Sequence, residues 1–462
     1  IDAIVASLSD ERTVLNRGAV GERRCTADEQ SQYDALEPKS VPNSDPDRIL
    51  YPNLGESNRT GPELSRRRLL AGSAAAGVVA TAGCTSDGSP NDADTRRPTV
   101  FVFNTGDGTV SVVDAETDEL VETRPLGLTS SFPSNQYTPV LADEPTDHLW
   151  LNVGRGVRAL SAGRLSENAA VETGSGANWL EQTPDGTHVV VSAREPTHGQ
   201  FRIDADPSSE TFGEVTARID RTPDGGRGDN AGPGPCDVTI HPGGNYAYVP
   251  DIFGDTLTVL RVDPFEVVTQ IDVEPVGDGP ARPWMGTVSP DGETLLVEHN
   301  EGRTGTESIW DLGDPASPRQ TTRLTADDGL GGRPLTSEIG PDSVTGYVFT
   351  PGSDDITVVD LEAGTVADRI DLGGSAFVGT WNPSHTKLYV PVQTANEVAA
   401  IDHERGEIVE RISVGPSPYG ATSALVRPRP ESTSGVYVAL ARFGGPVETT
   451  YCLGNCACGH EL

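Results

Sequence analysis

The chain has 462 residues, of which 35% are hydrophobic, and its 69 acidic and 34 basic residues give a formal net charge of -35. This size and hydrophobic content suffice for one large domain with tails. Lys39 and Lys387 are the two lysines, so arginine supplies nearly all the positive charge. An acidic chain without a basic stripe excludes general nucleic-acid binding, because nothing offsets the repulsion from phosphates.

The first segment, residues 1–64, is polar, contains prolines and has no strong hydrophobic periodicity. It fits none of the elements that follow. We therefore predict that most of it is either a mis-assigned N-terminal extension, from an overlong gene-start assignment, or a disordered segment that is removed with a signal.

Residues 65–84 have the order of an export signal. Arg66 and Arg67 precede a Gly/Ala-rich apolar run that ends at Ala82-Gly83-Cys84. The run is about 15 residues long, which is short for a transmembrane helix and typical of a signal h-region. The arginine pair resembles a twin-arginine signal, and the residues before Cys84 resemble a lipobox. We predict export by the twin-arginine route and lipid attachment at Cys84, which places the protein on the outer face of the cell membrane. The alternative is a short helix with a buried cysteine.

Residues 85–97 are small, polar and acidic. Such a composition predicts a flexible linker that holds the next domain away from the membrane.

From Val100 onward, a strand-turn-strand phrase recurs about every 48 residues, a period typical of β-propeller blades. One copy begins at Tyr248-Val249-Pro250-Asp251 and continues through Thr256-Leu257-Thr258-Val259. The residues that end the third strand of each unit are Asp114, Leu160, Asp204, Asp263, Asp311, Asp360 and Asp402. The spacing predicts an all-β fold over residues 98–444, a seven-bladed β-propeller, with eight blades as the alternative.

Turn phrases and two irregularities complete this prediction. Pro-Asp-Gly and related turns, such as Pro184-Asp185-Gly186, predict hairpin tips between the first two strands of each blade. The long interval between Asp204 and Asp263 contains the loop 222–234, which we interpret as an insertion. The first unit lacks an innermost strand, so we expect a strand near the C-terminus, from 419–426 or 436–443, to close the ring.

These phrases carry a family resemblance. The segment Gly415-Pro416-Ser417-Pro418-Tyr419-Gly420, together with Tyr-Val-x-x and Thr-Val-x-Val-Val-Asp, resembles the repeat of YVTN-type β-propellers. That family includes archaeal surface-layer proteins, and it is similar in shape to lactonase propellers and to the d1-haem domain of cytochrome cd1. The acidic, lysine-poor composition resembles that of proteins from extremely halophilic archaea.

The mouth of the central channel is the expected binding place of a propeller. Arg282, Trp284, Arg333 and Tyr419 lie where the chain enters inner strands, and His241 lies on or beside one. Aromatic and arginine side chains there suit an anionic or planar ligand, and His241 is a candidate axial ligand for a haem. The alternative is that these residues pack between blades.

The tail, residues 445–462, is a second candidate site. Cys452, Cys456, Cys458 and His460 lie close together in sequence, and they predict a site for Cu or Zn. The spacing of Cys452, Cys456 and His460 resembles the dinuclear copper loop of cytochrome oxidase, although the methionine that follows in that loop is absent. The alternative is disulfide bonding among the tail cysteines and Cys236.

Three functions remain open from the sequence. The leading hypothesis is a non-enzymatic, lipid-anchored cell-surface propeller that binds a protein, polymer or metal. The second is a lactonase-like hydrolase, which needs a base and an electrophile such as Glu298, His299 and Arg282 in mutual contact. The third is an exported redox or metal-binding protein that uses the Cys/His tail.

Overall fold

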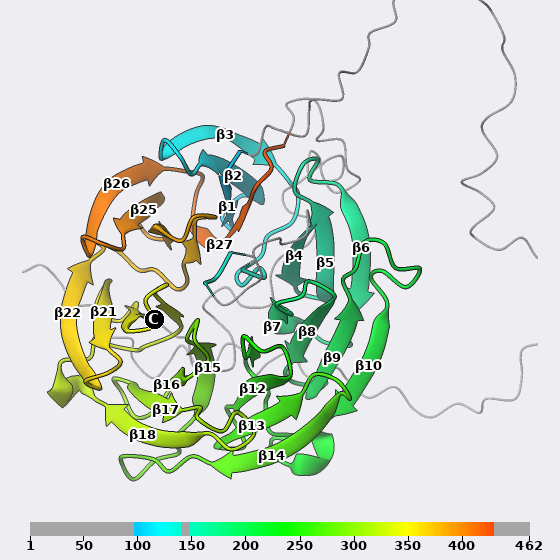
Figure 1. Cartoon of the computed structure of the whole chain (residues 1–462), viewed down its shortest axis with the longest axis vertical. Helices are drawn as coiled ribbons and strands as arrows, with labels where there is room; N and C mark the ends of the chain where they lie inside the picture. Colours follow the sequence, from blue (N-terminus) through cyan, green and yellow to red (C-terminus); the bar gives the residue numbers. More distant parts are fainter. Residues whose placement is uncertain (1–96, 136, 140–147, 429–462) are drawn as a thin grey trace, which may run out of the picture. The chain divides into compact units, whose positions relative to one another are not determined.

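The computed structural model describes residues 97–135, 137–139 and 148–428. Within these residues the chain forms seven antiparallel sheets arranged in a ring (Figure 1). The prediction of seven blades is therefore confirmed. Helical structure in the described part is limited to two short 3-10 turns, η4 (Thr222–Asp224) and η5 (Ala326–Asp328). None of its helices has the length and hydrophobicity needed to span a bilayer.

Each blade runs from a buried inner strand to an exposed outer strand. Blade 1 contains β27 (Pro418–Ala424), β1 (Thr99–Asn104), β2 (Thr109–Asp114) and β3 (Glu119–Pro125), and blade 2 contains β4 (His148–Val153), β5 (Gly156–Ser161) and β6 (Glu167–Glu172). Blade 3 contains β7 (Ala177–Gln182), β8 (His188–Ala193), β9 (Gly199–Asp204) and β10 (Val215–Asp220), and blade 4 contains β11 (Thr239–Ile240), β12 (Tyr246–Asp251), β13 (Thr256–Arg261) and β14 (Glu266–Asp272). Blade 5 contains β15 (Pro283–Val288), β16 (Thr294–His299), β17 (Thr306–Asp311) and β18 (Arg319–Leu324). Blade 6 contains β19 (Ser337–Ile339), β20 (Thr345–Thr350), β21 (Asp355–Asp360) and β22 (Thr365–Asp371), and blade 7 contains β23 (Thr380–Trp381), β24 (Lys387–Val392), β25 (Glu397–Asp402) and β26 (Glu407–Ser413).

The ring is closed by a strand from the far end of the propeller. β27 pairs antiparallel with β1, and Thr99 lies opposite Ala424. The expected closing strand at 419–426 is therefore present, one or two residues shifted, whereas the segment 436–443 lies outside the described residues.

Local sequence explains the hairpin tips. In the turn between β7 and β8, an Asp185 carboxylate oxygen accepts hydrogen bonds from the Thr183 hydroxyl at 2.6 Å and from the Thr187 backbone N–H at 3.0 Å. Gly186 has a φ of 70°, a conformation that glycine adopts without steric strain. The Pro-Asp-Gly phrase thus fixes both the reversal and the register of the two strands.

The tyrosines of the repeat link neighbouring blades. The Tyr248 hydroxyl of blade 4 donates to the Pro315 carbonyl of blade 5 at 3.1 Å. Tyr347 of blade 6 contacts the His403 ring of blade 7 at 2.9 Å, and Tyr389 of blade 7 reaches the turn between β2 and β3 in blade 1. A tyrosine at this strand position therefore buries its ring and satisfies its hydroxyl in the next blade.

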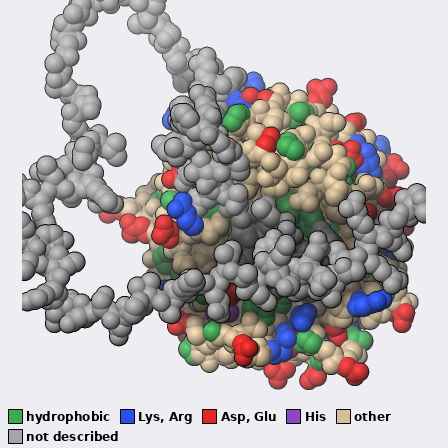
Figure 2. Space-filling view, turned by 180° about the vertical axis from the view of Figure 1, so that it is seen from behind, with side chains coloured by type: hydrophobic (Ala, Val, Ile, Leu, Met, Phe, Trp, Pro, Cys, Tyr) green, Lys and Arg blue, Asp and Glu red, His purple; other side chains and the backbone are tan. Residues whose placement is uncertain are grey.

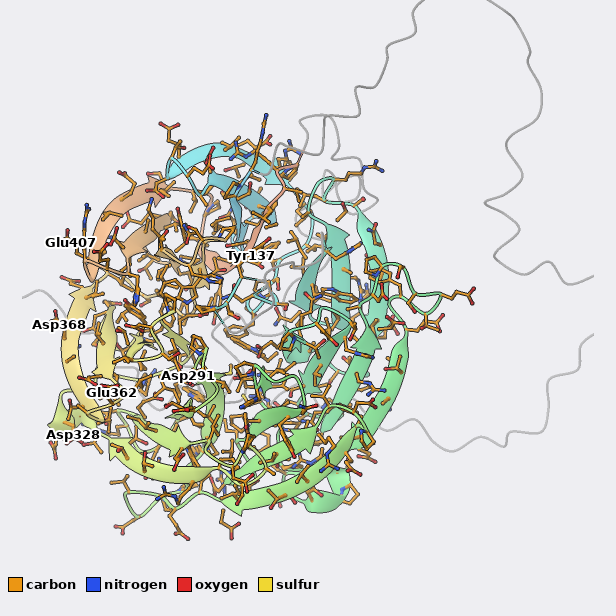
Figure 3. All side chains as sticks on the ribbon, viewed as in Figure 1. Tyr137, Asp291, Asp328, Glu362, Asp368 and Glu407 are labelled. Atoms are coloured by element: carbon orange, nitrogen blue, oxygen red, sulfur yellow. The ribbon has the colours of Figure 1, made fainter. Side chains whose placement is uncertain are left out.

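The outer rim is acidic. Asp328, Glu362, Asp368 and Glu407 are exposed and lie at the edge of the ring (Figure 3). Figure 2 shows acidic side chains around the margin of the opposite face. These carboxylates are thus in solvent, where dissolved salt screens their charge.

Candidate functional site

Apolar side chains from six blades and from the connection before β4 gather at the channel mouth, where the chain enters the inner strands, and they belong to one hydrophobic group. We name seven of them the mouth cluster: Phe132, Trp179, Cys236, Trp284, Leu335, Phe377 and Tyr419.

Aromatic rings pack closely in the mouth cluster. Phe377 stacks on Tyr419 with ring centroids 4.6 Å apart, and Phe132 lies 4.7 Å from Trp179 and 5.6 Å from Tyr419. All its members except Trp179 are buried. The alternative prediction, that residues at the mouth pack between blades, therefore fits Trp284 and Tyr419, because both rings pack within the cluster.

The other residues predicted at the mouth do not join this cluster. Arg282 is exposed, with a φ of 47°, and Arg333 is half-buried, with a φ of 56°. His241 lies in the turn after β11, at the opposite end of the inner strand from Cys236, with Nε2 3.2 Å from the Gly292 carbonyl. The predicted mouth residues therefore do not converge on one haem-like pocket.

Cys236 lies inside the mouth cluster and is 1% exposed. Its Sγ accepts from Asn178 Nδ2 at 3.2 Å and from Arg194 Nη1 at 3.9 Å. A disulfide to the tail would have to reach this buried position.

The remaining candidates lie outside the described residues. They are the tail residues Cys452, Cys456, Cys458 and His460, the predicted lipidation site Cys84, and the signal arginines Arg66 and Arg67.

The lactonase-type residues are not assembled. Glu298 and His299 are consecutive on β16, so their side chains point to opposite faces of the sheet. His299 Nε2 lies 2.7 Å from the Ser308 hydroxyl, and burial holds the pKa of His299 well below its usual range. Arg282 is exposed, and its backbone N–H donates to Asp255 at 2.8 Å. No base and electrophile from this set meet in a shared cleft.

Below the mouth cluster, the inner strands carry a ring of polar side chains, the polar girdle. Six of these residues belong to inner strands, and each is paired with the third residue of the next strand of its own blade. The seventh, Asn135, comes from the connection before β4. The members are Asn135, Glu181, Thr239, Thr287, Glu338, Thr380 and Thr422.

Hydrogen bonds of the polar girdle cross between blades. Asn135 Nδ2 donates to Glu338 at 3.0 Å, and Asn135 Oδ1 accepts from the Thr380 hydroxyl at 2.5 Å. Tyr137, on the same connection, lies toward the inside of the ring (Figure 3). Asn135 therefore ties blades 6 and 7 to the connection that precedes β4.

The polar girdle borders a small cavity of about 40 Å³ and carries perturbed carboxyls. Burial raises the pKa of Glu181 and of Glu338 to about 8. Burial also raises the pKa of Asp237, which accepts from the Gly286 backbone N–H at 2.7 Å. Sequence reasoning missed these residues, because each inner strand contributes one polar side chain and no contiguous motif marks them.

The insertion 222–234 forms a second hollow, on the surface of blade 4. Arg221, which precedes it, makes an ion pair with Asp251 at 2.9 Å, with side chains 1% and 0% exposed. A pocket of about 450 Å³ lies beside the loop, and its lining includes Gly226, Arg227 and Phe253. The long interval between β9 and β13 is thus an insertion anchored on blade 4.

Within the described ranges, no group of three or more His, Cys, Asp or Glu side chains is arranged to hold a metal ion. The tail on which a Cu or Zn site was expected lies outside those ranges.

No protein-family model and no curated protein matches the sequence. Among solved structures, the chain is similar to the periplasmic gluconolactonase of Pseudomonas aeruginosa, with a TM-score of 0.55, 17% identity and coverage of 71% of this chain and 99% of that chain. A putative 6-phosphogluconolactonase from Bacteroides fragilis has a TM-score of 0.56, 16% identity and coverage of 72% and 99%. A protein from Lactobacillus plantarum has a TM-score of 0.57, 13% identity and coverage of 71% and 99%. At these identities the likeness extends to the fold, a seven-bladed propeller with lactonase-like neighbours.

Proposed function

We propose that the chain is an exported, lipid-anchored β-propeller that acts as a binding or scaffold module at the cell surface. The observation that carries this proposal is the apolar packing of the mouth cluster. Phe132, Trp284, Phe377 and Tyr419 are buried in one hydrophobic group, so among the described residues these side chains pack against protein and do not line an open chamber. Recognition by the outer surface is the role that this arrangement favours.

The insertion 222–234 is the binding surface that we assign to this role. Its pocket is lined by Phe253, by the glycines Gly225 and Gly226, by the carboxylates of Asp224 and Asp272, and by Arg227, which is paired with Asp255 at 2.5 Å. Such a mixture suits a polar polymer or an extended peptide of the cell surface, because it offers both hydrogen bonds and a ring for packing.

The finer identity rests on sequence features. The repeat phrases support membership of the YVTN-type propellers, and the acidic composition supports a haloarchaeal origin. Arg66-Arg67 and Cys84 support twin-arginine export and a lipid anchor in the membrane. The tail cysteines and His460 would bind Cu or Zn, or form disulfides, outside the cell.

Cell fractionation tests the anchor. In a halophilic host, we expect the full chain to fractionate with membranes and to be released by detergent. Cys84→Ser should abolish lipid labelling and membrane retention, and a paired Arg66→Lys and Arg67→Lys change should keep the protein inside the cell. Membrane retention of Cys84→Ser at the wild-type level would contradict the lipid anchor.

Lactone hydrolysis is the second candidate, which the structural neighbours favour. We expect glucono-δ-lactone and 6-phosphogluconolactone to hydrolyse at the uncatalysed rate in the presence of the purified protein. Hydrolysis well above background that is lost in Glu298→Gln or His299→Asn would establish the enzyme and overturn the binding proposal.

A further inference from the structure

Blade 5 carries two buried carboxylates that face each other across neighbouring strands. Glu298 on β16 is paired in register with Glu307 on β17, and both residues are 0% exposed. Their side chains share a face with Leu296 and Ile309, which pack against residues of β19 and β20. The two carboxylates therefore lie between blades 5 and 6.

The other blades show what this position ordinarily holds. The corresponding cross-strand pairs are Phe103/Val110 in blade 1, Asn152/Val157 in blade 2, Ser192/Gln200 in blade 3, Pro250/Leu257 in blade 4, Phe349/Ile356 in blade 6 and Pro391/Val398 in blade 7. Four blades thus use an apolar pair and two use neutral side chains. Blade 5 departs from its own repeat by placing two ionisable groups where the fold packs apolar ones.

The two carboxylates have little hydrogen-bond support among the described residues. All four carboxylate oxygens of Glu298 and Glu307 lack a hydrogen-bond partner there. The nearest guanidinium, that of Arg323, donates to Glu301 at 3.0 Å and to Thr306 at 2.9 Å. Burial raises the pKa of both groups, and a buried carboxyl pair needs either a retained proton or a bound cation to be stable.

A third oxygen from blade 6 points to the same place. The Ser337 hydroxyl lies beside the Glu298 carboxylate, and Ser337 is 4% exposed. That hydroxyl also lacks a partner of normal hydrogen-bond geometry in the described part. Ser337 borders the channel cavity of about 40 Å³, which has room for a water molecule.

We propose that Glu298 and Glu307 of blade 5, with the Ser337 hydroxyl of blade 6, bind a hard divalent cation of the Ca²⁺ class. Ca²⁺ takes six to eight oxygen ligands, including carboxylates and waters, so two carboxylates and a hydroxyl suit the protein part of such a ligand set. The three donors named here are all oxygens, which favours a hard cation over Zn²⁺ and Cu²⁺. The ion joins ligands from two blades, so it clamps blade 5 to blade 6.

Calorimetric titration of chelator-treated protein with Ca²⁺ at constant NaCl tests this assignment. The wild type should show one saturable site and a melting temperature that rises with Ca²⁺ concentration. Glu298→Gln with Glu307→Gln should weaken binding by at least about tenfold, because both charged ligands are lost. The matched control, Glu293→Gln with Glu362→Gln, removes two exposed carboxylates from the same blades and should bind like the wild type.

A second variant guards against misfolding. Glu298→Phe with Glu307→Ile installs the pair that blade 6 uses at this register, and it should fold and give no Ca²⁺-dependent shift. The proposal is overturned if the wild type has no saturable Ca²⁺ site, which would leave a proton shared between the two carboxyls. It is also overturned if the Gln double variant binds Ca²⁺ as tightly as the wild type, or if Zn²⁺ binds this pair more tightly than Ca²⁺.

Discussion

Replacing Glu338 with glutamine should flatten the pH dependence of stability between about pH 5 and pH 8. Glu338 belongs to the polar girdle on β19 and accepts a hydrogen bond from Asn135 Nδ2 at 3.0 Å. Burial, with a smaller contribution from the nearby Glu181 and Glu298 carboxyls, raises its pKa from 4.5 to about 8. Folding therefore changes the proton affinity of this group strongly.

The sign and size of the effect follow from proton linkage. Below pH 4.5 the folded and unfolded states both hold the proton, so the full contribution to stability is present. Between pH 4.5 and 8 the folded state keeps a proton that the unfolded state loses, so the free energy of unfolding falls by about 1.4 kcal/mol per pH unit. The loss reaches about 3 kcal/mol at pH 7 and levels off above the folded pKa. Glutamine titrates no proton, and its amide oxygen still accepts from Asn135.

Urea unfolding, followed by tryptophan fluorescence at a series of pH values, measures this difference. NaCl is held constant and a chelator is present. The control Glu362→Gln changes an exposed carboxyl on the rim of the same blade (Figure 3). Its free energy of unfolding should change with pH as that of the wild type does. If the free energy of unfolding of Glu338→Gln has the same pH dependence as that of the wild type, Glu338 is ionised in the folded protein, and burial does not raise its pKa.

Three further perturbations probe the ring. Tyr389→Phe removes the hydroxyl that joins blade 7 to blade 1 and should lower the free energy of unfolding by about 1 to 2 kcal/mol, while Tyr246→Phe should change it little. Phe377→Ala should lower it by about 3 to 5 kcal/mol by opening the mouth cluster, whereas Val276→Ala, at a site 59% exposed, should not. Lowering NaCl from multimolar to millimolar should reduce the melting temperature, since repulsion within a chain of charge -35 is then unscreened; an unchanged melting temperature would contradict a halophilic surface.

The blades could be predicted from the sequence because their signals are local. A hairpin tip such as Pro184-Asp185-Gly186 is determined by its own residues, and the third-strand ends, such as Asp360, recur at the same place in each unit. Closure by β27 also followed from counting, since one blade lacked an inner strand.

The channel interior could not be predicted in this way, because its residues meet only once the ring is closed. Glu181 and Glu338 come from separate blades and share no motif. His241 shows how closeness in sequence differs from closeness in the fold, since it is five residues from Cys236 in sequence. Extended chain rises about 3.3 Å per residue, so this spacing spans about 16 Å and puts His241 beyond the mouth.

Blade 1 is completed by strands made at the two ends of the propeller, and this sets an order of events in the cell. The Thr105 hydroxyl donates to the Ser417 carbonyl at 2.8 Å across a sequence separation of 312 residues. Until the ribosome has produced β27, the inner edge of β1 has no partner within its own chain. The finished ring can therefore form only after nearly all of the propeller has been synthesised, and long-range closure of this kind is slow.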